Sequence, residues 1–167
     1  MYRRIEDFLK TYEQQAEFTS KIFATLTDGN LDQRVTRDHR SLREIAWHVV
    51  VSVGEMMSRT GLRLSSIDQE SLPPASAADI AAGYDAVSKE LLEALRGTWN
   101  DETLEITDDM YGEQWPRGFT LSALVQHEIH HRGQMTVLLR QAGAKVPGTY
   151  GPSKEEWTKY GTQPPAY

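Results

Sequence analysis

The segment QHEIHHRG, residues 126–133, holds three of the five histidines of the chain. Imidazole nitrogens are common ligands of zinc and other transition metals. The residues HEIHH also match the H-E-x-x-H pattern of zinc proteases, in which Glu128 would be the general base. The segment is therefore a candidate protease site, a candidate metal site of another kind, or a polar helix face that matches the pattern by chance.

The spacing of His127 and His131 favours a metal site. Helical residues four apart lie about 40° apart around the axis and about 6 Å apart along it, so two imidazoles at this spacing can bind one ion. Apolar residues recur around this pair at intervals of three and four, and their stripe should face the interior of a helix bundle. Its members are Leu121, Leu124, Met135 and Leu138. His130 lies about 100° from His131 and should point away.

His48 is the candidate for a third ligand. It lies beside an inward apolar stripe of an earlier helical segment, and metal sites in bundles are built from inward side chains on facing helices. Three neutral imidazoles would leave a coordination position open, as in catalytic zinc sites. For His48 taken alone, a histidine bonded to a backbone carbonyl is the simpler interpretation. His39, in a polar connector, is predicted to lie on the surface.

The longer patterns of zinc proteases are not met. Gln134 and Val137 stand where metzincins have glycine and the third histidine. Glu155 or Glu156 lies at a distance suited to a third ligand, but both occupy a tail rich in glycine and proline. We therefore disfavour the protease hypothesis and expect Glu128 to be a solvated carboxylate, or one that contacts a metal ligand from outside.

Four amphipathic segments should position these side chains. Apolar spacing predicts helices over residues 5–26, 41–64, 76–96 and 121–141. Ser41 and Glu44 form a capping box at the start of the second helix, and Ser76 and Thr120 are expected to cap the third and fourth.

The remaining segments carry little strand pattern. Residues 102–106 alternate between polar and apolar and predict one short strand, for which no partner is evident. In the tail, Ser153 is expected to cap a short helix that Trp157 and Tyr160 dock on the body. The sequence thus predicts an all-α fold: an antiparallel four-helix bundle with long connectors and a C-terminal tail, in a single domain over residues 1–167.

Composition excludes several classes of protein. The net charge of −6 disfavours non-specific nucleic-acid binding, and no basic run offsets it. The chain has no cysteine, so disulfides, a cysteine zinc finger and a thiol nucleophile of its own are excluded. No apolar segment of signal-peptide or membrane-spanning length is evident, and we expect a cytoplasmic protein with no membrane partner.

Several segments together resemble the DinB/YfiT-like superfamily. They are HHRGQ at residues 130–134, SLREIAWHVV with its single histidine, GFTLSALVQH before the histidine pair, and VPGTYGPSKEEW in the tail. The resemblance covers nearly the whole chain and implies a four-helix bundle in up-down-down-up order, often a homodimer. It also implies a divalent metal, here zinc or nickel, held by His48, His127 and His131. Glu128 falls at a position that varies in this superfamily.

Members of the superfamily include thiol S-transferases, a thiol-dependent isomerase and proteins described as metal-dependent hydrolases. The resemblance thus implies an enzyme whose metal activates a thiol or a water molecule, with a low-molecular-weight thiol or another small molecule as substrate. No catalytic residue follows from it. A thiol's carboxylates would need a cationic group, and Arg43, Arg59 and Arg132 are candidates, although each is more simply an exposed helical arginine.

Two further hypotheses remain open. Hydrolysis by a metal-activated water would need a general base, and Glu128 or Glu55 is a candidate because each lies near a proposed ligand. A non-catalytic metal-binding protein of a stress response would instead need a closed coordination sphere. Tyr150, Glu155 or Glu156 would then supply the fourth ligand.

Overall fold

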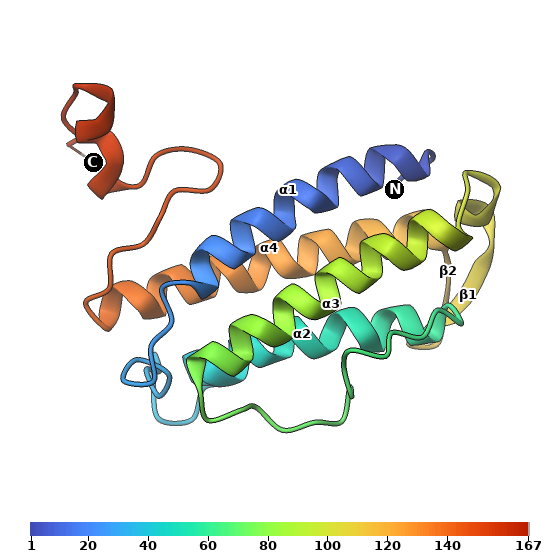
Figure 1. The fold of residues 1–167 in the computed structure, drawn as a ribbon, viewed down its shortest axis with the longest axis horizontal. Coiled ribbons are helices and arrows are strands. Elements are labelled where there is room, and N and C mark those ends of the chain that lie inside the picture. Colours follow the sequence, from blue (N-terminus) through green and yellow to red (C-terminus); the bar gives the residue numbers. More distant parts are fainter. Residues whose placement is uncertain (167) are drawn as a thin grey trace.

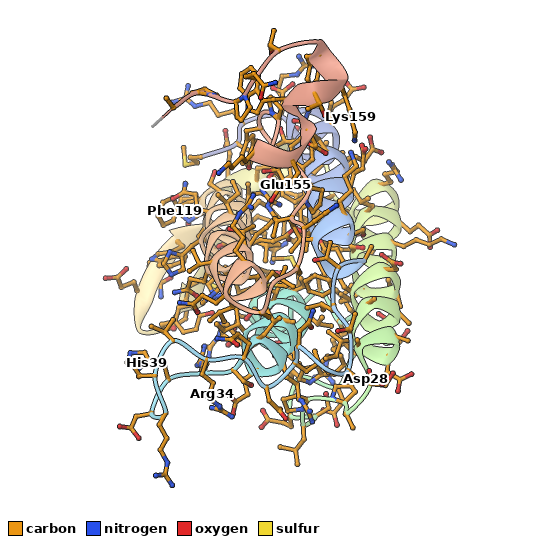
Figure 2. All side chains as sticks on the ribbon, turned by 90° about the vertical axis from the view of Figure 1, so that its left-hand side faces the viewer. Asp28, Arg34, His39, Phe119, Glu155 and Lys159 are labelled. Atoms are coloured by element: carbon orange, nitrogen blue, oxygen red, sulfur yellow. The ribbon has the colours of Figure 1, made fainter. Side chains whose placement is uncertain are left out.

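The computed structural model describes residues 1–166, and within them four α-helices form an antiparallel bundle (Figure 1). The helices are α1 (Ile5–Phe23), α2 (Leu42–Arg59), α3 (Ala77–Thr98) and α4 (Arg117–Gln141). In Figure 1, α1 and α4 run in one direction and α2 and α3 in the other, so the predicted up-down-down-up order is confirmed. Seen nearly end-on in Figure 2, the four helices surround one core, in which α2 and α4 are neighbours.

Apolar burial holds the bundle together. Ile22 of α1, Val50 of α2, Leu91 of α3 and Leu139 of α4 are each completely buried. Complete burial of one such side chain contributes about 1.5–3 kcal/mol relative to an exposed position. The periodic stripes of the sequence therefore become the core. None of the helices in residues 1–166 is long and apolar enough to span a bilayer.

The start of α2 follows the prediction, and its end does not. Ser41 accepts a hydrogen bond from the Glu44 backbone N–H at 3.2 Å, and Glu44 Oε2 accepts one from the Ser41 backbone N–H at 2.6 Å, which completes the capping box. The helix ends at Arg59 rather than at residue 64. Gly61 has φ of 81°, and a glycine in this left-handed conformation commonly terminates a helix.

The start of α4 was predicted four residues too late, with the wrong cap. Pro116 occupies the N-cap position, and Thr120 is buried inside the helix. The earlier turn forms because Gly118 packs against the N-terminal segment: Tyr2 donates its backbone N–H to the Gly118 carbonyl at 2.9 Å. A Cβ atom at residue 118 would lie only 2.1 Å from the Tyr2 carbonyl oxygen. The two residues of this contact are 116 positions apart in the sequence, so no local pattern indicates it.

The predicted strand at residues 102–106 is wrong. Residues Glu102–Glu105 form a 3₁₀ turn, held by mutual hydrogen bonds between Asn100 and Thr103. The strands are instead β1 (Thr107–Met110) and β2 (Glu113–Pro116), which pair as an antiparallel hairpin. Tyr111 and Gly112 form the two-residue turn, with φ of 61° and 87°. A glycine at the second position suits such a turn, whereas tyrosine at the first is unusual.

After Gly143 the tail rises at one end of the bundle (Figure 1), where Tyr150 contacts Arg132 of α4 and Gln15 of α1. A 3₁₀ helix spans Lys154–Tyr160 after Ser153, close to the short helix expected there. Trp157 is partly buried, but Tyr160 is 67% exposed, so the expectation that both aromatic rings dock on the body is wrong for Tyr160.

Candidate metal centre

Three histidines from two neighbouring helices converge between α2 and α4. His48 comes from the first half of α2, and His127 and His131 come from consecutive turns of α4. The Nε2 atom of His127 lies 3.0 Å from that of His48 and 3.1 Å from that of His131. The three rings therefore present their Nε2 atoms to a common point.

This geometry fits one transition-metal ion. Nitrogens about 2.0–2.1 Å from a shared ion lie about 2.8–3.4 Å from one another in octahedral or tetrahedral coordination. Hydrogen bonding alone fits less well, because each neutral Nε2 offers either one N–H or one lone pair. His127 Nε2 faces two other nitrogens, and only a shared cation gives all three a favourable partner.

A contact at the Nδ1 atom of His131 favours the tautomer whose Nε2 atom can bind a metal ion. His131 Nδ1 lies 2.7 Å from Gln134 Oε1, an acceptor, so this nitrogen carries the proton. Its Nε2 is then left with the free lone pair that a metal ion requires. Ser52 Oγ lies 3.4 Å from His48 Nδ1 and makes the equivalent, longer contact on α2.

The electrostatic environment keeps the imidazoles neutral. Burial lowers the pKa of His48 and of His127 to about 4, and the neighbouring histidines add to the effect. Burial also lowers the pKa of His131. At neutral pH the three rings are uncharged, which is the form that coordinates metal ions.

The histidines lie at the margin of the core rather than inside it. All three are partly exposed, although their spacing had predicted interior positions. The interior of α4 at this level is taken by the residues one position further along, Glu128 and Arg132, which are 1% and 2% exposed. A helix advances by 100° per residue, so the two pairs face different neighbours. The cluster therefore lies where core and surface meet.

Glu128 is therefore neither solvated nor a base beside the histidines. Its Oε1 atom accepts hydrogen bonds from Thr19 of α1 and Tyr84 of α3, each at 2.6 Å. Burial raises the pKa of the Glu128 carboxyl, and the hydrogen bonds and Arg132 only partly oppose that shift. The carboxyl group points to the α1 and α3 side of α4, whereas His127 and His131 point to α2. Within residues 1–166, Glu128 therefore does not form the zinc-protease arrangement with the two histidines.

The arginine candidates are all engaged elsewhere. Arg132 is buried in the core, whereas the sequence predicted an exposed helical arginine. Arg43 pairs with Asp32 at 3.1 Å, and Arg59 pairs with Glu55 at 2.5 Å and covers the Tyr111 ring. Burial is the main cause of the lowered pKa of the three histidines, and the charge of the exposed Arg40, which the sequence did not single out, adds a smaller contribution. No local pattern marks it, because it lies in the connector before α2.

The tail residues considered as a fourth ligand are also occupied. Tyr150 bonds to Arg132 and to Gln15 of α1. Glu155 pairs with Arg140, and Glu156 accepts two backbone N–H groups of the tail itself. Figure 2 shows Glu155 near the lower end of the tail helix. Among residues 1–166, only the three histidines form a group suited to a metal ion.

The other two histidines lie outside the cluster. His39 is exposed on the connector, where its ring meets Thr36 at 2.6 Å, and Figure 2 shows it pointing away from the bundle. His130 is exposed on α4, with its ring centre 4.9 Å from that of His131. The surface location predicted for His39 is confirmed, and His130 points outward as expected.

Three comparisons with known proteins each match nearly the whole chain. The model of the DinB family matches residues 1–165. The uncharacterized protein YrdA of Bacillus subtilis (strain 168) is 43% identical over 165 residues, 99% of each chain. The crystal structure of a DinB-like protein from Bacillus cereus ATCC 10987 superimposes with a TM-score of 0.85 at 40% identity, covering 90% of this chain and all of the other.

A more distant structure shares the fold alone. The DinB-like protein YjoA of Bacillus subtilis has a TM-score of 0.68 at 13% identity, over 86% of this chain and 97% of the other.

Proposed function

The chain belongs to the DinB family, and from that premise we propose that it is a metal-dependent enzyme whose ligands are His48, His127 and His131. The ion would be zinc or nickel, because imidazole ligands suit both. When bound, such an ion acts as a Lewis acid that lowers the pKa of a thiol or of water. The observation that carries the proposal is the convergence of three Nε2 atoms at 3.0–3.1 Å.

The chain's own residues support an open site. Three protein ligands leave room for a substrate atom, and the tail groups that would close the site are bonded elsewhere. A non-catalytic protein with a closed metal site is therefore the less favoured alternative. We propose that the nucleophile is the sulfur atom of a low-molecular-weight thiol, since the protein has no cysteine of its own. Hydrolysis remains the second candidate, with Glu55, two turns after His48 on α2, as its general base, although Glu55 is bonded to Arg59 and Tyr111.

Metal binding is tested by removing single ligands. His127→Ala and His131→Ala should each abolish stoichiometric binding of Zn²⁺ or Ni²⁺, while circular dichroism still reports a helical fold. His130→Ala is the matched control, because His130 lies on the same helix segment and points outward. Calorimetric titration of metal-free protein measures the stoichiometry. One-to-one binding at wild-type affinity in either ligand variant would disprove the site.

The nucleophile is tested with the metal-loaded protein. Cysteine or glutathione is incubated with the electrophile monobromobimane, and loss of the thiol is followed with and without a chelator. Thiol transfer predicts loss above the uncatalysed rate that the chelator and His127→Ala both abolish. Equal rates with and without protein would argue against thiol transfer.

A further inference from the structure

A second face of α4, about 100° around the helix from the histidines, carries a buried polar network, and we propose that it positions the metal ligands. Glu128 and Arg132 connect α4 to α1, α3 and the tail, and so hold His127 and His131 opposite His48. This inference rests on the proposed metal site and adds positioning residues to it.

Glu128 joins α4 to two other helices. Thr19 of α1 and Tyr84 of α3 both donate their hydroxyl groups to Glu128 Oε1. Thr19 and Tyr84 are themselves completely buried. The buried Tyr12 of α1 also lies next to the Glu128 carboxyl group. A single carboxyl group therefore relates α4 to α1 and α3 at once.

Arg132 makes the connection one turn later. Its Nη1 donates to the Gln15 carbonyl at 3.2 Å and to Thr19 Oγ1 at 2.8 Å. Its Nη2 donates to Gln15 Oε1 at 2.7 Å and to the Tyr150 hydroxyl at 2.8 Å. Because Thr19 bonds both Glu128 and Arg132, the two residues belong to one network rather than to two separate contacts.

Directional bonds are needed at this level because apolar packing there is interrupted. The buried apolar residues of α4 lie before and after the network: Leu121, Leu124 and Val125 on one side, Met135, Leu138 and Leu139 on the other. Apolar contacts have no strong directional preference, so they tolerate small rotations of a helix. Hydrogen bonds weaken steeply outside a narrow range of distance and angle.

The positions of the ligand atoms are sensitive to small rotations of α4. A rotation of α4 by about 10° moves a side-chain tip about 6 Å from the axis by about 1 Å. A displacement of that size is larger than the tolerance of a metal site, about 0.5 Å. Each network residue directly follows a ligand in sequence, His127 before Glu128 and His131 before Arg132. The bonds that fix the rotation thus act within one residue of the ligands.

The test replaces the carboxyl group by an apolar group of similar size. In Glu128→Met, Thr19 and Tyr84 lose their acceptor, and metal affinity should fall about 10- to 100-fold, as for other residues that orient ligands. The Co²⁺ absorption spectrum should change, because coordination geometry changes. In Glu128→Gln, an amide oxygen still accepts both bonds, so affinity and spectrum should stay close to wild type.

The control separates positioning from stability. Leu139→Ala removes a completely buried side chain from the same helix, so it should lower the unfolding temperature and leave Co²⁺ affinity unchanged. If Glu128→Met does not fold, Tyr84→Phe, which removes one donor only, should give a smaller loss of affinity with the helical fold intact.

The outcomes are distinguishable. Wild-type protein that takes up no ion would overturn the proposed function and the positioning role with it. Wild-type protein that binds one ion, beside a folded Glu128→Met variant with the same affinity and Co²⁺ spectrum, would overturn the positioning role alone. Loss of affinity in Glu128→Met, restored in Glu128→Gln, supports it.

Discussion

At the residue scale, neighbouring positions on α4 have opposite roles. His127 and His131 are partly exposed beside α2, while Glu128 is buried toward α1 and α3 and Arg132 toward α1 and the tail. The protease pattern H-E-x-x-H thus combines residues from two different environments. Its glutamate contributes to the core and its histidines to a candidate metal site. The pattern as a whole therefore does not correspond to a single functional site.

A residue-scale prediction concerns the support of His131. Gln134→Leu removes the acceptor 2.7 Å from His131 Nδ1, so the ring loses the contact that selects its tautomer. We expect metal affinity to fall about 10-fold, measured by competition with a chromogenic chelator. Gln126→Leu, an exposed glutamine of the same helix, is the control and should bind as wild type. Unchanged affinity in Gln134→Leu would show that this contact is dispensable.

At the scale of elements, the connectors do more than join helices. The β1–β2 hairpin brings Tyr111 to α2, where its hydroxyl group donates to Glu55 at 2.6 Å. The connector between α2 and α3 is fastened to α3: Glu90 accepts the backbone N–H groups of Ser65 and Ser66 at 2.7 and 2.8 Å. Each contact fixes a segment that has no regular periodicity of its own.

The Glu90 contact predicts a dependence of stability on pH. Burial opposes ionisation, but hydrogen bonds from Ser66 and Ser65 outweigh it and lower the pKa of Glu90 to about 2 from an ordinary value of 4.5. Because the folded state favours the carboxylate, its stabilising effect is complete above pH 4.5 and is lost as the pH falls toward 2.

The measurement is urea unfolding of the wild type and of Glu90→Gln between pH 6 and pH 2. The difference in unfolding free energy should be largest near pH 6 and shrink as the pH falls. Glu93→Gln is the control, since Glu93 is an exposed residue of the same helix whose partner, Lys89, lies 3.9 Å away. A difference between wild type and Glu90→Gln that stays constant with pH would contradict this account.

At the scale of the whole molecule, helix order creates the candidate site. In the up-down-down-up bundle α4 lies between α1 and α2, so one helix serves both the histidine cluster and the buried network. Ligands from α2 and α4 then couple metal binding to folding, because the unfolded chain does not hold residues 48 and 127 together.

This coupling predicts stabilisation of the whole bundle by metal. At a free ion concentration 100 times the dissociation constant, binding adds about 2.7 kcal/mol to the unfolding free energy. For a domain of this size that corresponds to about 5–10 °C in Tm. Calorimetry with Zn²⁺ and with a chelator measures the shift, and His131→Ala should show none. A shift that persists in His131→Ala would indicate binding elsewhere.

Local sequence determined the helices, the Ser41 capping box and the candidate ligands. These follow from interactions within about four residues, which periodicity and capping patterns record. The resemblance to a known family supplied the helix order. Only the tertiary structure decided that Glu128 and Arg132 belong to the core, that the three histidines meet at its margin, and that β1 pairs with β2. Each of these depends on which surfaces meet when distant segments pack, and 100° of helix rotation separates a ligand from a core residue.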